Sequence, residues 1–322
     1  MRVLALSLLL LSSPAAAQTH VLVVCGLGGE PRYQQAFLET GLAIVSAAEG
    51  RLGVAAGSMR LLTEDPTRDP RVTGRSTKGG IDTAMASLAR ESGAGSLILI
   101  VLIGHGSATG ADARLNLPGP DLTAAQFATM LAPFETQQVV VVNASSASGD
   151  WVRALAGPRR VVLTATRSGV ERDETLFGRE FAVALGSADA DRDKDGRLSA
   201  LEAFDFARRE VARAYERDQR LRTEHALLEA DGDGVGAMEP VATAGDGAAA
   251  AGVFLDAGAS RAVAPELAGL AATRDSLERE VIQLRNGKAQ LDPAEYDRRL
   301  EALLLELARV TRALKSREGG RP

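Results

Sequence analysis

The chain has 322 residues, of which 45% are hydrophobic and 25% are charged, and its formal net charge is −5 at pH 7. A chain of this length and apolar content can bury a full core, which excludes an intrinsically disordered protein. Its basic residues are scattered and outnumbered by acidic residues, so the sequence offers no basic patch to a phosphate backbone. We therefore expect no nucleic-acid partner.

The first 17 residues have the pattern of a cleavable signal peptide. A short basic start is followed by an apolar run over 3–11 and by small residues that end at Ala17. The run is too short to span a bilayer, and a buried first helix fits less well because no polar residues alternate with the leucines. We expect a periplasmic or secreted mature chain without a membrane span.

Strands and helices are predicted to alternate along residues 18–188. Apolar runs predict strands over 20–25, 58–62, 96–103, 138–142 and 160–166. Amphipathic segments predict helices over 31–49, 77–91, 123–132 and 150–156. This alternation predicts an α/β fold with a mostly parallel sheet flanked by helices. The single cysteine, Cys25, is predicted to be a small buried residue at the end of the first strand, so no disulfide framework is expected.

Two of the predicted strands end in residues that can do chemistry. His105 follows the strand over 96–103, and the serine-rich turn 143–149 follows the strand over 138–142. Because reactive groups collect at the carboxyl ends of parallel strands, a base and a nucleophile are expected to meet there. The simpler alternative is that the histidine lies in a turn and that the serines cap the next helix.

Four short segments resemble the legumain-like and caspase-like peptidases. Gly-His-Gly-Ser-Ala-Thr-Gly at 104–110 resembles their His-Gly-Ala-Pro-Gly region, and Ser-Ala-Ser-Gly at 146–149 resembles their Cys-x-Ser-Gly. Residues 164–171 are similar to their Ala-Thr-Thr-Ala segment and the glutamate that follows it. Arg-Tyr-Gln-Gln-Ala at 32–36 resembles Tyr-Arg-His-Gln-Ala, with the pocket arginine displaced by one position and the histidine missing. The resemblance covers residues 20–185.

The resemblance implies a caspase-like fold in which serine replaces the catalytic cysteine. It implies Ser146 as the nucleophile, His105 as the base, Gly106 as an oxyanion-hole amide, and a substrate pocket formed by Thr166, Arg167 and Glu171. Ser145 and Ser148 are alternative positions for the hydroxyl. A serine must pass its proton to a base within hydrogen-bonding reach, whereas a thiol is already partly ionised at neutral pH.

With serine in place of the catalytic cysteine, three alternative functions are considered. The first is a pseudopeptidase that binds a peptide or protein segment in the inherited groove. The second is an active Ser-His peptidase or acyl transferase that uses Ser146 and His105. The third is a non-enzymatic assembly protein that acts through the C-terminal helices.

Residues 191–202 fit the twelve-residue EF-hand loop, with carboxylates at positions 1, 3 and 5, glycine at 6, serine at 9 and glutamate at 12. Calcium takes about six to eight oxygen ligands, and this spacing supplies them around a sharp turn at Gly196. The predicted ligands are Asp191, Asp193, Asp195, the Arg197 carbonyl, Ser199 and Glu202. Helices are expected on both sides, over 174–185 and 200–225. Calcium is therefore the expected cofactor, and a solvated acidic loop is the alternative.

A weaker acidic pattern begins at Glu229, near the end of the segment 189–230 that holds the EF-hand loop and its flanking helix. It offers oxygens at positions 1, 3 and 5 and glycine at 6, but position 12 falls on Pro240 and only Glu239 is close. It is either a degenerate partner loop or a flexible acidic turn. His225, on the helix expected before it, is interpreted as a packing or capping residue.

The C-terminal part is predicted to contain a linker and a helical hairpin. Residues 231–262 are rich in Gly and Ala, which is typical of a linker or a loosely packed extension. Leucines repeat at a/d spacing in two segments of 263–318, which predicts an antiparallel α-helical hairpin. The hairpin could fold on the rest of the chain, bind a partner, or self-associate through residues 264–316.

Overall fold

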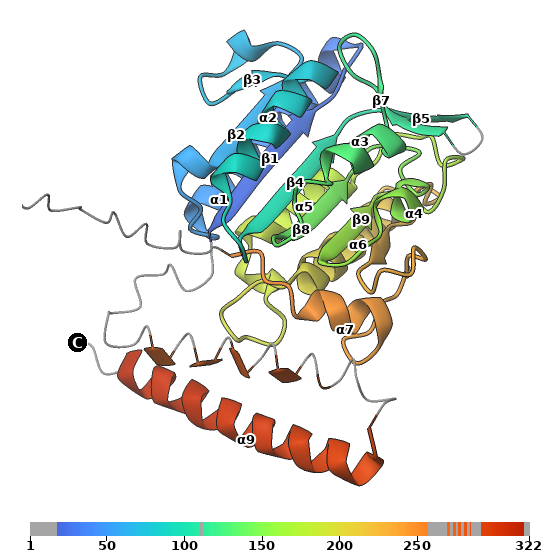
Figure 1. Cartoon of the computed structure of the whole chain (residues 1–322). Helices are drawn as coiled ribbons and strands as arrows, with labels where there is room; N and C mark the ends of the chain where they lie inside the picture. Colours follow the sequence, from blue (N-terminus) through green and yellow to red (C-terminus); the bar gives the residue numbers. More distant parts are fainter. Residues whose placement is uncertain are drawn as a thin grey trace, which may run out of the picture.

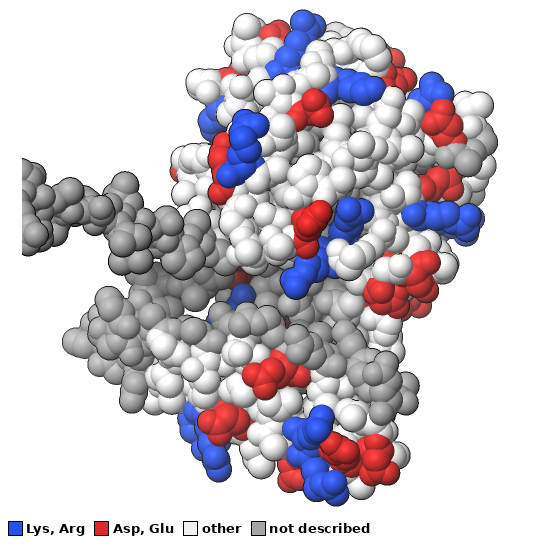
Figure 2. Space-filling model, in the orientation of Figure 1, with Lys and Arg blue, Asp and Glu red and all other residues white. Residues whose placement is uncertain are grey.

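The computed structural model describes residues 18–109, 112–256 and 291–318, together with isolated helical positions between 269 and 284. The signal peptide expected over residues 1–17 lies outside this described part. No helix among the described residues has the length and apolar character needed to cross a membrane. On the face drawn in Figure 2, basic and acidic side chains are interspersed.

A seven-stranded sheet forms the centre of the molecule, with the order β10-β9-β8-β4-β1-β2-β3 (Figure 1). Its strands are β1 (Thr19–Cys25), β2 (Met59–Thr63), β3 (Gly74–Arg75), β4 (Leu97–Ile103), β8 (Gln138–Asn143), β9 (Arg160–Thr164) and β10 (Leu227–Glu229). All neighbouring pairs are parallel except β9 and β10, which are antiparallel. The predicted mostly parallel sheet is therefore confirmed.

Helices cover both faces of this sheet because alternate residues of each strand point to opposite sides. Val23 and Leu99 belong to the core formed with α1 (Pro31–Gly50), α5 (Phe177–Gly186) and α6 (Ala200–Arg217). The neighbouring residues Leu22 and Ile98 belong to the core formed with α2 (Lys78–Glu91), α3 (Ala124–Met130) and α4 (Trp151–Leu155). The central strands are buried on both faces, which explains their continuous apolar runs.

A small antiparallel sheet, which the sequence pattern did not predict, follows β4. Its strands are β5 (Gly106–Thr109), β6 (Asp112–Leu115) and β7 (Leu122–Thr123), in the order β5-β6-β7. Single-turn 3-10 helices occur at Ala56–Ser58, Pro66–Arg68 and Ala188–Ala190. Because β5 begins at Gly106, the small sheet holds the backbone that leaves the end of β4.

The structure differs from the expected helix boundaries around the acidic loops. The helix expected over 200–225 ends at Arg217, because Gln219 adopts a left-handed backbone conformation with φ of 51°. His225 therefore lies outside the helix. The stretch expected as a loose linker contains α7 (Gly245–Ala251), and Ala250 is fully buried. Small alanine side chains let this short helix pack closely on its neighbours.

The last helix, α9 (Pro293–Glu318), begins as its sequence predicts. The Asp292 carboxylate accepts hydrogen bonds from the two amides that follow Pro293. Four apolar side chains pack together across two segments: Val310, Leu314, Leu270 and Leu277. The antiparallel hairpin and its self-association stay predictions.

Candidate functional site

The predicted base and nucleophile emerge at one edge of the central sheet. β4 and β8 are neighbouring parallel strands, with Leu102 paired to Asn143, so His105 and Ser146 follow adjacent strand ends (Figure 1). β1 lies between β4 and β2, so the strand order reverses beside this edge, which is where α/β proteins form binding crevices. We call His105, Gly106 and Ser146 the strand-end site.

His105 packs in an aromatic setting on α1. Its ring lies edge-on to Tyr33 at 4.5 Å and to Phe37 at 5.1 Å between ring centroids. Burial lowers the pKa of His105, and the nearby Glu174 carboxylate offsets part of this effect. The imidazole is therefore neutral at pH 7 and able to accept a proton. Among the described residues, however, it makes no hydrogen bond with the Ser146 hydroxyl.

The Ser146 hydroxyl is instead held by the backbone of Gly106. Its Oγ accepts a hydrogen bond from the Gly106 amide at 3.1 Å and lies 3.3 Å from the Gly106 carbonyl, to which it can donate. The side chain is 3% exposed. A Cβ at position 106 would lie 2.1 Å from the Ser146 carbonyl oxygen, so only glycine fits. The amide expected to serve an oxyanion hole is thus bonded to the nucleophile position itself.

The rest of the serine-rich turn is a buried hydrogen-bond network. Ser145 Oγ donates to Asn143 Oδ1 at 2.7 Å. Thr166 Oγ1 accepts from the Ser148 amide at 2.7 Å and from the Gly149 amide at 3.0 Å. Thr166 is fully buried, so this residue holds the turn and does not line an open pocket.

The predicted pocket residues Arg167 and Glu171 meet each other and a residue that sequence reasoning placed elsewhere. Glu171 Oε1 lies 3.1 Å from Arg167 Nε and 2.6 Å from His225 Nδ1. Glu171 Oε2 also accepts from the His225 amide at 3.1 Å. Residues 171 and 225 are far apart in sequence, and no local pattern signals their contact.

A cavity of about 390 Å³ lies beside this pair. It is lined by Ala165, Arg167, Phe177, Arg208, Val211, Arg222, Glu224, His225, Ala226, Met238 and Glu239. Glu224 accepts hydrogen bonds from the Leu176 and Phe177 amides at the start of α5. Burial raises the pKa of Glu224 to about 7, although these amides favour its charged form. Arg222 is exposed and has no hydrogen-bond or ion-pair partner among the described residues.

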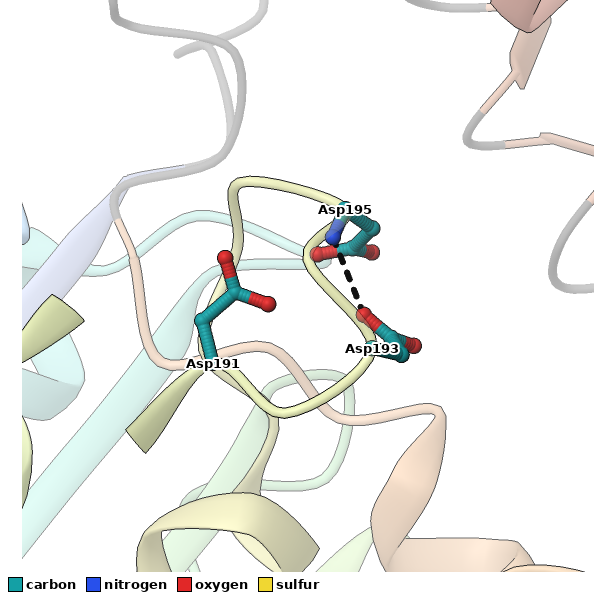
Figure 3. A group of neighbouring side chains, drawn as sticks. All are labelled: Asp191, Asp193 and Asp195. Carbon is teal, nitrogen blue, oxygen red and sulfur yellow. Dashed lines mark hydrogen bonds between the residues drawn. The ribbon is translucent and has the colours of Figure 1, made fainter. Parts of the chain in front are cut away.

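The loop 191–202, which we call the first acidic loop, gathers three aspartates around one bend (Figure 3). Asp191 Oδ2 accepts from the Gly196 amide at 3.0 Å. Asp193 Oδ1 accepts from the Asp195 amide at 3.0 Å, and Asp195 Oδ1 accepts from the Arg197 amide at 2.7 Å. Carboxylate oxygens of the three aspartates lie within 4.8 Å of one another.

Glu202 and Ser199 close the first acidic loop at the start of α6. They form a capping box, in which Glu202 Oε2 accepts from the Ser199 amide at 2.9 Å. Glu202 Oε1 reaches back to accept from the Arg192 amide at 2.8 Å. The Arg197 guanidinium pairs with Asp256 at 3.3 Å and lies over the Phe254 ring, which fixes the outer side of the loop.

One buried oxygen in the first acidic loop has no partner among the described residues. Asp191 is 7% exposed, and its buried Oδ1 makes no hydrogen bond with any of them. Burial and the neighbouring carboxylates raise the pKa values of Asp193 and Asp195. A hard cation with oxygen ligands would satisfy the orphaned oxygen and offset this repulsion, so the donor set fits a divalent cation. The choice of calcium stays a prediction.

No protein-family model and no curated protein matches the chain. Among solved structures, the chain is similar to the crystal structure of protein GSU0716 from Geobacter sulfurreducens, with 13% sequence identity and a TM-score of 0.41. The match covers 66% of this chain and 92% of that chain. By its own topology, the chain has a mixed α/β fold with a mostly parallel central sheet flanked by helices.

Proposed function

We propose that this protein is an exported, calcium-binding homologue of caspase-like peptidases that binds peptide segments without cleaving them. One observation carries the proposal: the Ser146 hydroxyl bonds to the Gly106 peptide and not to His105. A serine nucleophile depends on a base that takes its proton, and among the described residues this hydroxyl makes no hydrogen bond with a basic side chain. The Gly106 amide is also occupied, so it offers no free donor to an oxyanion.

The sheet topology supports the caspase-like part of the proposal. His105 and Ser146 follow neighbouring parallel strands, as the resemblance to legumain-like peptidases implies. The pocket glutamate of that resemblance, Glu171, lies next to the serine turn, because its carbonyl accepts from the Ala147 amide at 2.7 Å. Glu171 therefore contacts both the serine turn and two residues that line the cavity, Arg167 and His225.

The cavity favours a peptide that carries an acidic side chain. Arg167 is neutralised by Glu171, and Arg208 lies near Asp205 and Glu239. Arg222 has no such partner and can pair with a carboxylate of the peptide. The exposed Met238 side chain adds adaptable apolar surface for the neighbouring peptide residue.

The test compares the mature chain, residues 18–322, with Ser146→Ala, Ser146→Cys and Arg222→Gln in calcium. Binding to a library of labelled peptides is measured by fluorescence anisotropy, and cleavage is measured by mass spectrometry. We expect no cleavage by the natural chain or Ser146→Ala, and cleavage by Ser146→Cys, because a thiolate needs less help from His105. Arg222→Gln should weaken the binding of acidic peptides about tenfold. The matched control, Arg312→Gln on α9, should leave this binding unchanged.

Two results would contradict the proposal. Cleavage by the natural chain that disappears in Ser146→Ala would establish an active Ser-His peptidase or acyl transferase. Absence of both peptide binding and cleavage in all variants would remove the peptide-binding role.

Assembly through the C-terminal helices is a second candidate function. Leu304 and Leu305 are exposed on α9, and adjoining large apolar side chains on a helix favour contact with another surface. Deletion of residues 264–322 should then lower the number of chains in the assembly, calculated from the mass measured by light scattering after size-exclusion chromatography. An unchanged oligomeric state would argue against this candidate.

A further inference from the structure

The residues Glu229–Val235, which we call the second acidic loop, repeat the hydrogen-bond pattern of the first. Asp231 Oδ1 accepts from the Asp233 amide at 3.2 Å, and Asp233 Oδ1 accepts from the Val235 amide at 2.7 Å. These are the bonds that the third and fifth positions make in the first acidic loop. Positions 4 and 6 also share left-handed backbone conformations: Lys194 and Gly196 in the first loop, Gly232 and Gly234 in the second.

The first position of the second acidic loop holds a buried carboxylate with an orphaned oxygen. Glu229 is fully buried, and its Oε1 points into the loop to accept from the Gly232 amide at 2.7 Å. Its Oε2 is buried and has no hydrogen-bond partner in the part of the chain that the structure describes. Asp191 Oδ1 is orphaned in the same position of the first loop. A buried carboxylate oxygen without a donor is costly, and a bound cation removes that cost.

The second loop is closed by a residue that counting along the sequence does not reach. Glu239, beside the twelfth position, has an 83% exposed side chain and lies 3.6 Å from Arg208. Asp246 in α7 is 8% exposed, and its Oδ1 accepts from the Ala230 amide at 2.7 Å and the Asp231 amide at 3.3 Å. Glu202 makes the corresponding bonds, to the second and third amides, in the first loop.

The long and the short carboxylate side chains occupy opposite positions in the two loops. The first loop uses a short Asp191 and a long Glu202, whereas the second uses a long Glu229 and a short Asp246. Asp246 lies on the separate helix α7, which brings its backbone close enough for the shorter aspartate side chain to bond to the loop amides. Each loop therefore assembles four carboxylates around one bend, with two of its amides bonded to the closing side chain.

We propose that the second acidic loop and Asp246 form a second site for a divalent cation of the calcium class. Its carboxylate ligands are Glu229, Asp231, Asp233 and Asp246. Carboxylate oxygens of the first three lie within 4.8 Å of one another, a spacing that one hard cation can span. Asp246 adds negative charge next to Asp231 and Asp233, which the cation neutralises.

The test is calcium titration by isothermal titration calorimetry on the mature chain after treatment with a chelator. The natural chain should bind two calcium ions. Asp193→Asn/Asp195→Asn changes two exposed side chains of the first loop and should leave one ion bound. Asp231 and Asp233 are also exposed, and adding Asp231→Asn/Asp233→Asn to this variant should abolish binding of the remaining calcium ion. Thermal unfolding in chelator should be alike for all of these chains, which shows that the fold is kept.

The role of Asp246 is tested in the chain whose first loop is disabled. Asp246→Asn should weaken the remaining calcium event at least tenfold, and Glu239→Gln, the matched control, should leave it unchanged. The proposal is overturned if the chain with a disabled first loop binds no calcium, even when the natural chain binds one ion. If the natural chain binds one ion, and this ion survives in the chain with a disabled first loop and is lost with Asp231 and Asp233, the result would support the second site and contradict the first. Weakening by Glu239→Gln but not by Asp246→Asn would overturn the assignment of the closing ligand.

Discussion

The strand-end site and the first acidic loop differ in how completely the chain satisfies its own polar groups. At the strand-end site, the Gly106 peptide satisfies the Ser146 hydroxyl, and Thr166 satisfies the turn that follows. In the first acidic loop, a buried oxygen of Asp191 has no partner among the described residues. Both regions carry sequence motifs for chemistry. The turn at the strand-end site also has one buried atom that is unpartnered within the described chain, Nδ2 of Asn143, but in the loop the unpartnered atom is a carboxylate oxygen, which a cation can bind.

The largest expected effect concerns the two acidic loops. Calcium at a hundredfold excess over its dissociation constant should raise the free energy of unfolding by about 2.7 kcal/mol for each loop that binds it. Urea unfolding in calcium and in chelator measures this gain. Asp193→Asn/Asp195→Asn should remove the part of this gain that comes from calcium in the first loop. Asp231→Asn/Asp233→Asn should remove the part that comes from the second loop. An equal gain in the chain with all four changes would place the calcium elsewhere.

A loss smaller than the combined gain from both loops is expected when the turn at the strand-end site is disrupted. Thr166→Val keeps the branched shape but removes the hydroxyl that accepts from the Ser148 and Gly149 amides. Two buried amides without an acceptor should lower the free energy of unfolding by about 4 kcal/mol. Thr129→Val, at an exposed position of α3, is the control and should change it by less than about 0.5 kcal/mol. A loss below about 1 kcal/mol for Thr166→Val would mean that the amides find other acceptors.

Glu224, which lines the cavity beside Arg167 and His225, should make stability depend on pH. The pKa of Glu224 is about 7 in the folded chain, against 4.5 for an ordinary glutamate, so the folded state binds the extra proton between these values. The contribution of Glu224 to stability is therefore greatest below pH 4.5 and falls by roughly 3 kcal/mol as the pH rises through 7. Glu224→Gln should remove this fall, measured by urea unfolding in chelator. Exposed Glu216→Gln should retain it, and a fall that persists in Glu224→Gln would assign it to another group.

The smallest expected effect is at the nucleophile position. Ser146→Ala removes one neutral hydrogen-bonding group and should cost about 1 kcal/mol of stability, with peptide binding unchanged. Thermal unfolding and anisotropy check the two parts. If Ser146→Ala leaves the stability unchanged, the Ser146 hydroxyl is free to contact a substrate. The strand-end site would then be available to a ligand, as the first acidic loop is.

Much of the sheet and the first acidic loop could be predicted because their signals are local. The continuous apolar runs of β4 and β8 reflect burial on both faces, and the ligands of the first loop lie within twelve consecutive residues. Cys25 is also buried as predicted, and burial raises its pKa to about 12. The small sheet β5-β6-β7 was missed because its strands are short and lack apolar runs.

The amino-acid sequence by itself determined the alternation of strands and helices, the positions of His105 and Ser146 just after two strands, and the bend of the first acidic loop. Each follows from the periodicity or spacing of neighbouring residues. Only the tertiary structure decided that Ser146 bonds to Gly106, that Glu171 meets His225, and that Asp246 closes the second acidic loop. These contacts join residues that lie 40, 54 and 16 positions apart, so they depend on strand order and helix packing, which no local pattern encodes.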